Sequence, residues 1–239
     1  MSAASTKQPE APWSAGLQGA RANLVPGLIL QFFALTLVLA YYHHAPTRAW
    51  CEKLAAFRTE QGFIYSLFST SFFGGLLPCI YMKLHPGTRG RYDFKQNLLL
   101  VVFWAYKGVE VDLWYRLLVR FVGAGTDART VITKMFLDQF VCCPLFFVPV
   151  TVIVYTWCES HFNTAAVAAD LRAPSWYRRR VPPMLISNLG VWTPTVCIIY
   201  SLPSALQIPL FNLVLCFFTL LLAHLAKKDE APAIIPEKA

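Results

Sequence analysis

Residues 104–139 read WAYKGVEVDLWYRLLVRFVGAGTDARTVITKMFLDQ and place ionisable side chains inside two otherwise apolar segments. Charged groups at membrane depth are costly, so they usually face a bundle interior or a water-filled cavity and pair with one another. The stretch therefore predicts two consecutive helices that bury their charges against protein, and it holds the candidate functional site. The predicted intramembrane polar cluster consists of Lys107, Glu110, Asp112, Arg116, Lys134, Asp138 and Gln139.

The spacing of these residues predicts ion pairs along each helix. Lys107 and Glu110 are three residues apart, and Asp112 and Arg116 are four apart, so both pairs are neighbours on a helix. At 100° per residue the two pairs lie on roughly opposite sides, which indicates protein on most sides of this helix. The following helix opens with a further pair at a spacing of four, Lys134 and Asp138.

The composition of the 239 residues is that of a polytopic membrane protein. Hydrophobic residues make up 56% and charged residues only 14%, whereas soluble domains carry about 25% charged residues. The net charge of +8 comes from short basic clusters between apolar runs. Because these clusters lack the aromatic stacking platform of single-strand binders, we expect no nucleic-acid partner. The expected partners are membrane lipids, chiefly anionic headgroups.

The apolar runs predict an all-α transmembrane helix bundle over residues 23–226, between polar tails at 1–22 and 227–239. A transit peptide would be rich in arginine and poor in acids, so the N-terminal tail is expected to stay uncleaved. Basic residues are more numerous on the side that holds both termini, which fits six spans, or five if the last segment is re-entrant. The predicted spans are 24–42, 63–82, 97–122, 133–157, 189–202 and 205–225.

Three connecting features carry further predictions. Residues 43–62 favour an interfacial helix whose charges need no further role, and small residues recur every four positions at Ser66, Thr70 and Gly74, which allows close helix approach. Pro78 predicts a kink near the end of the second span. Residues 158–188 are interpreted as the longest soluble connection. It ends in a basic run before two prolines, and this run is the candidate headgroup-binding site: Arg178, Arg179 and Arg180.

The cysteines and histidines of the sequence predict neither a disulfide framework nor a metal site, and no enzyme motif is found. Seven cysteines without a C-x-x-C pair are interpreted as apolar packing residues rather than a disulfide framework. Five scattered histidines favour no metal site. Motifs of hydrolases, metalloproteases and P-loop proteins are missing from the sequence, and Glu110 and Asp112 fall on different helix faces. We therefore expect a non-enzymatic protein without a cofactor.

Several short motifs together resemble a known membrane-protein family. They are Asp93-Phe94-Lys95, Gly108, Trp114-Tyr115-Arg116 with Leu118 and Arg120, Lys134-Met135 with Leu137-Asp138-Gln139, Asn188, Trp192, Pro194 and Pro203. Over residues 92–225 the chain is similar to the family of the peroxisomal membrane protein of twenty-two kilodaltons and its inner-mitochondrial relatives of the Mpv-seventeen and Sym-one type. It departs from the family pattern at Val109, where proline is usual, and its first span is additional.

The resemblance implies a multi-pass protein of the mitochondrial inner membrane, with the peroxisomal membrane second, and a role in membrane permeability or metabolite homeostasis. Two interpretations of the polar cluster stay open: the charges line a path for a solute, or they form ion pairs that dock the helices. A different hypothesis is an accessory subunit of a respiratory complex or ATP synthase. A transporter of another type predicts internal repeats, and the sequence shows none that is convincing.

Overall fold

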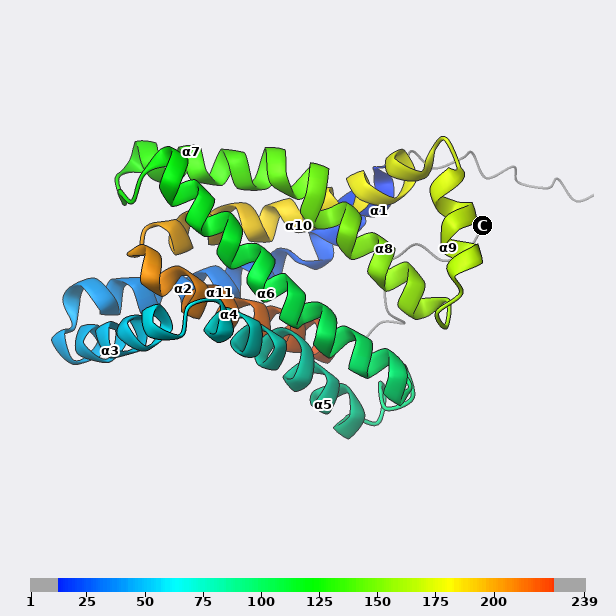
Figure 1. Cartoon of the computed structure of the whole chain (residues 1–239), viewed down its shortest axis with the longest axis horizontal. Helices are drawn as coiled ribbons and strands as arrows, with labels where there is room; N and C mark the ends of the chain where they lie inside the picture. The colour runs from blue at the N-terminus through cyan, green and yellow to red at the C-terminus, as the bar shows by residue number, and fades with distance from the viewer. Residues whose placement is uncertain (1–12, 226–239) are drawn as a thin grey trace, which may run out of the picture.

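The computed structural model describes residues 13–225, with side chains to residue 220, and this part of the chain is helical without strands. The all-α prediction is therefore confirmed, while most of the N-terminal tail and the tail 227–239 lie outside the described residues. Figure 1 shows the arrangement. The elements are α1 (Ser14–Ala22), α2 (Leu24–His43), α3 (Ala45–Gln61), α4 (Phe63–Thr70), η1 (Ser71–Leu76), α5 (Leu77–Leu84), α6 (Phe94–Val122), α7 (Ala128–Phe136), η2 (Leu137–Phe147), α8 (Val148–Glu159), α9 (Thr164–Arg172), α10 (Trp176–Tyr200) and α11 (Ser204–Leu225).

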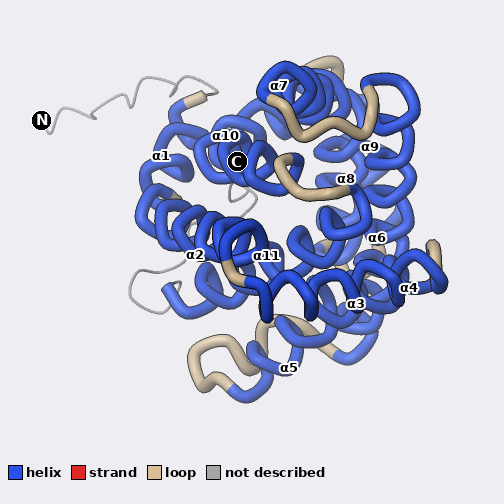
Figure 2. The backbone as a smooth tube through the Cα atoms, turned by 90° about the vertical axis from the view of Figure 1, so that its left-hand side faces the viewer, coloured by secondary structure: helices blue, strands red, loops and turns tan. Residues whose placement is uncertain are grey.

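The bundle consists of long helical segments. Two of them are composite, because α4, η1 and α5 follow one another without a break, as do α7, η2 and α8. Four helical stretches are long and apolar enough to cross a membrane: 24–43, 63–84, 128–159 and 176–200. The chain is therefore a membrane protein. Figure 2 looks onto the end of the bundle that α3 crosses. The helix predicted within residues 43–62 is thus present as α3.

Helices α4 and α6 approach each other closely. A Cβ on Gly108 of α6 would come within 2.1 Å of the Ser66 carbonyl oxygen and 2.7 Å of the Thr70 Cβ. Ser66 and Thr70 are both fully buried. The close approach predicted from the small residues is confirmed, and Gly108 is the complementary small residue on the partner helix.

Gly108→Ala is expected to lower the free energy of unfolding by about 1–3 kcal/mol, because its methyl group would push α6 away from the α4 backbone. The matched control is Gly190→Ala in α10, where a Cβ meets nothing within 4 Å. There the better helix propensity of alanine should leave stability equal or slightly higher. Thermal unfolding in detergent compares the two, and equal effects would contradict the packing account.

Residues 158–188, predicted as a soluble connection, are the main error of the sequence-based topology. Helix α10 begins at Trp176, so it contains the three arginines and both prolines and is longer than the predicted span 189–202. Part of the predicted polar tail forms α1, which packs along this extension. A Cβ on Gly16 would meet the Pro183 carbonyl oxygen at 2.9 Å. The proline turn is therefore covered by a helix, which is how membrane helices accommodate proline.

The main core lies between α2, α6, α10 and α11. Leu30, Ile199 and Val214 are among its fully buried members, and Tyr115 of α6 packs against the Tyr200 ring of α10 at 5.2 Å. This core packs on α6 next to the face that contacts α4. The second span contains the π-helix η1 ahead of Pro78, and Pro78 itself stands in the first turn of α5. The irregularity predicted at the proline therefore lies before it.

Candidate functional site

Helix α6 carries the ionisable residues into the bundle. A capping box of Asp93 and Gln96 fixes where this helix of 29 residues begins. From that start, Lys107, Glu110 and Asp112 fall in its central turns, where they are 6%, 9% and 0% exposed. These charges are enclosed by protein, and they face two different neighbours.

On one face lies the Asp112 cluster, formed by Arg58, Ser66, Asp112 and Arg116. The Arg58 guanidinium of α3 forms a buried ion pair with the Asp112 carboxylate, and the Ser66 hydroxyl of α4 donates to Asp112 Oδ2 at 2.5 Å. Arg116 Nε donates to Oδ1 at 3.0 Å, which confirms the predicted pair within α6. Burial lowers the pKa of Arg58, and the Asp112 carboxylate opposes this by favouring the charged form.

The Asp112 cluster fastens α3 and α4 to α6. Arg58 is the one buried residue of α3, so this ion pair is the buried polar attachment of α3 to α6. Arg58 was assigned no role from the sequence, and that was wrong. Its partner is 54 residues away, and no helical spacing connects the two. The arrangement matches the interpretation in which ion pairs dock helices.

On the opposite face lies the Asp138 cluster, formed by Lys107, Glu110, Trp114, Asp138 and Gln139. Lys107 and Glu110 form the predicted ion pair. The Tyr106 hydroxyl donates to Glu110 Oε1 at 2.9 Å. The Lys107 ammonium also lies 4.5 Å from the centre of the Phe147 ring, in η2, which favours the cation through the ring face.

Asp138 is buried and held by neutral donors. Trp114 Nε1 donates to Oδ1 at 3.0 Å, and Gln139 Nε2 donates to Oδ2 at 3.3 Å. The Tyr200 hydroxyl of α10 lies beside the same carboxylate. Among the described residues Asp138 has no ion pair, although it is only 4% exposed. A buried carboxylate without an ion pair is costly, and ionisable groups of this kind inside a membrane bundle are candidates for functional sites.

The predicted pair of Lys134 and Asp138 is absent, which corrects the sequence analysis. Lys134 is 1% exposed, and its ammonium has neither an ion pair nor a hydrogen bond within the described part of the chain. Its electrostatic partner is the more distant Asp127 at the start of α7. The Asp138 carboxylate is instead held by Trp114 of α6 and by Gln139, at the point where the π-helix η2 begins, so it faces α6 rather than the Lys134 ammonium.

The site lies where η2 stands away from α6. The backbone of α6 meets α7 at one end and α8 at the other, while the contact with η2 is made by long side chains. Trp114 and Phe147 meet edge to face there, with ring centres 6.3 Å apart. Pro144 lies inside η2 and removes one backbone donor from this segment. Irregular backbone at membrane depth is tolerated where it is buried in protein or lines a cavity.

Other residues singled out from the sequence lie elsewhere. Arg179 and Arg180 in the first turns of α10 both pair with Asp170 of α9, at 3.0 and 3.2 Å. Arg178 is exposed beside them. The family-motif residues are dispersed through the packing: Trp114 and Tyr115 in α6, Met135 in α7, Trp192 against Phe211 and Phe218, Pro194 within α10, and Pro203 in the turn before α11.

Comparison with protein-family models, with curated proteins and with solved structures finds no match to this chain.

Proposed function

We propose that this chain is a non-enzymatic integral membrane protein that controls the permeability of its membrane to a small charged solute through the Asp138 cluster. The observation that carries the proposal is the separation of Lys134 from Asp138. Each is enclosed by protein and lacks an ion pair among the described residues. Unpaired charges are costly in a bundle and are typical of ion and substrate pathways.

The proposal assigns the two interpretations of the charges to different faces of α6. The Asp112 cluster is fully paired and attaches α3 and α4, as docking requires. The Asp138 cluster faces η2, which α6 contacts through long side chains such as Trp114. The proposed location is the mitochondrial inner membrane, with the peroxisomal membrane second, on the resemblance of residues 92–225. Arg178, Arg179 and Arg180 are proposed to contact anionic lipid headgroups.

Asp138→Asn is expected to change ion flux several-fold without loss of folded protein. The amide keeps an oxygen that accepts from Trp114 Nε1 but removes the charge that a permeating cation would meet. The measurement is K⁺ and Cl⁻ efflux from liposomes at equal amounts of folded protein. The control is Asp170→Asn, which breaks the ion pairs with Arg179 and Arg180 outside the cluster. Equal flux from wild type and Asp138→Asn would reject the proposal.

A second candidate function, an accessory subunit of a larger inner-membrane complex, is favoured by one surface. Within the stretch 128–159, the apolar window of 18 residues has a mean hydropathy of 2.0, yet only 6% of that window is buried within the chain. Its outward side chains include Phe136 and Leu145, which are 55% and 71% exposed. Native electrophoresis of gently solubilised inner membranes tests this candidate. Migration as a lone small species would exclude a stable complex, whereas co-migration with a respiratory complex or ATP synthase would support it.

A further inference from the structure

Lys134 and Asp138 lie on one face of the same helical segment, yet their charges stay apart. The backbone between them is α-helical, since Phe136 has φ −62° and ψ −48° and Leu137 has φ −62° and ψ −38°. On such a backbone, residues four apart are neighbours. Both charged side chains are enclosed by protein, with exposed fractions of 1% and 4%. The backbone therefore brings two opposite charges within reach of an ion pair that the side chains do not form.

Trp114 holds the Asp138 carboxylate on the α6 side. The indole Nε1 donates to Oδ1 at 3.0 Å, and Gln139 Nε2 donates to Oδ2 at 3.3 Å, so both oxygens accept a hydrogen bond. An indole nitrogen can only donate, and a hydrogen bond to an ionised acceptor is about twice as strong as one between neutral groups. The Phe147 ring of η2 packs edge to face on Trp114, with ring centres 6.3 Å apart. The donor is thus fixed in place by its own packing.

Two lysines could compete with Trp114 for this carboxylate. Lys107 of α6 attracts it, but Lys107 is already paired with Glu110. The Lys134 ammonium has neither an ion pair nor a hydrogen bond among the described residues, although Asp127 attracts it from a distance. Lys134 is therefore the cation that would take up the carboxylate if Trp114 released it.

The two arrangements of the carboxylate have opposite consequences for a permeating ion. A turn of the Asp138 side chain about its Cα–Cβ bond exchanges the Trp114 donor for the Lys134 ammonium and needs no change of the backbone. A carboxylate paired with lysine is neutralised and offers little attraction to a passing cation. A carboxylate held by neutral donors keeps its charge, which the site requires if it acts on ions.

We propose that Trp114 is the positioning residue of the permeability site: its indole N–H directs the Asp138 carboxylate towards α6 and keeps it from pairing with Lys134. This role rests on the proposed function of the Asp138 cluster, because only a site that acts on ions is altered by such pairing. Trp114 acts through Asp138 and not by meeting the ion. Lys134 is the latent partner that switches the site off when the indole N–H is lost.

Trp114→Phe tests this role, because phenylalanine keeps an aromatic ring against Phe147 but carries no N–H donor. We expect K⁺ efflux from liposomes, per folded chain, to change several-fold in the direction seen for Asp138→Asn. The second step repeats the substitution in a Lys134→Met background, where the latent partner is missing. There Trp114→Phe should change efflux by less than about twofold relative to Lys134→Met alone.

Thermal unfolding gives a second readout that does not depend on ion flux. Lys134→Met and Asp138→Asn should shift the melting temperature nearly additively in the wild type, since the two side chains form no pair there. In Trp114→Phe, where they pair, the two shifts should not add. Additive shifts in both backgrounds would overturn the proposal. If Trp114→Phe yields too little folded protein, Gln139→Met removes the second donor and is measured in the same way.

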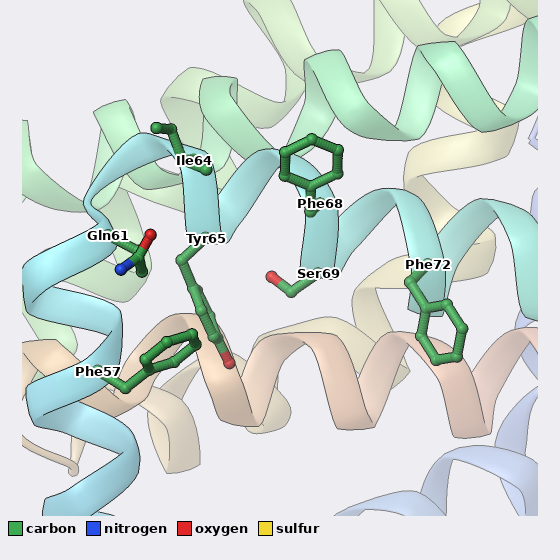
Figure 3. A pocket seen from close by; sticks show the side chains of 7 residues that line it. All are labelled: Phe57, Gln61, Ile64, Tyr65, Phe68, Ser69 and Phe72. Atoms are coloured by element: carbon green, nitrogen blue, oxygen red, sulfur yellow. The ribbon is translucent and has the colours of Figure 1, made fainter.

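Two controls report the effect of losing aromatic bulk elsewhere. Trp192→Phe trims a ring that packs on Phe211 and Phe218. Phe68→Leu trims an exposed ring in the apolar hollow lined by residues of α3, α4 and η1 (Figure 3). Both variants should keep the efflux of the wild type.

The outcomes separate the role of Trp114 from the proposed function. Efflux that is unchanged in Asp138→Asn rejects the proposed function. Efflux that is altered by Asp138→Asn but not by Trp114→Phe overturns the positioning role alone. An effect of Trp114→Phe that persists in full with Lys134→Met overturns it as well.

Discussion

Replacing Asp112 with alanine is expected to lower the free energy of unfolding by about 3–5 kcal/mol, because it strands a buried cation. Arg58 would lose its carboxylate partner while remaining enclosed between α3 and α6. The Ser66 hydroxyl would lose its acceptor as well. Denaturation in mixed detergent micelles, followed by circular dichroism, measures the loss. The same substitution should release α3 and raise proteolysis near Gly62.

Two further variants identify the cause of this loss. Arg116→Gln removes the other cation of the Asp112 cluster, but the Arg116 side chain is 44% exposed, so its loss should cost less than about 1 kcal/mol. The double replacement Arg58→Met with Asp112→Leu should recover most of the stability, since it removes both buried charges together. A double variant as unstable as Asp112→Ala would contradict the stranded-charge explanation.

Lys107→Met is expected to cost about 3–5 kcal/mol for the same physical reason on the opposite face. Glu110 would keep only the Tyr106 hydroxyl as a donor while remaining buried. Methionine preserves the length and the apolar stem of the lysine, so packing against Phe147 is largely retained. Thermal unfolding of the detergent-solubilised chain provides the measurement.

The pair Lys107→Met with Glu110→Gln separates charge from shape at this site. Neutralising both partners should restore stability to within about 1 kcal/mol of wild type, because no buried charge is left alone. If the double variant stays as unstable as Lys107→Met, the pair would be needed for packing rather than for mutual neutralisation. The stability of each variant can then be compared with its ion efflux from liposomes.

Contacts within one helix were the part of the site that the sequence could predict. Lys107 with Glu110 and Asp112 with Arg116 follow from α-helical periodicity, and both pairs are present. The all-α bundle follows from apolar runs of membrane length. The close packing at Ser66 and Thr70 follows from small residues at intervals of four. Each of these rests on a local rule that needs no knowledge of the neighbouring helix.

The predictions were wrong where the side-chain partners or the helix bounds depend on a neighbouring helix. Lys134 and Asp138 are four residues apart but form no ion pair, because the Asp138 carboxylate accepts hydrogen bonds from Trp114 of α6 and from Gln139. The segment with the basic run and Pro182 and Pro183 was interpreted as the end of a soluble connection, yet α10 begins at Trp176 and runs through it, covered by α1. The role of Arg58 depends on a contact across 54 residues. A signal for α1 was available in Gly16 and Gly19, three residues apart, which pack onto α10.

The central claim is that the two faces of α6 do different work: the Asp112 cluster attaches helices, and the Asp138 cluster controls permeability. Ion efflux per folded chain, measured side by side for Asp138→Asn and for Arg58→Met with Asp112→Leu, tests it most directly. We predict that Asp138→Asn changes efflux several-fold at undiminished stability, while the double variant keeps the efflux of the wild type. Efflux that is unaltered in Asp138→Asn, or that follows stability alone in both, would contradict the account.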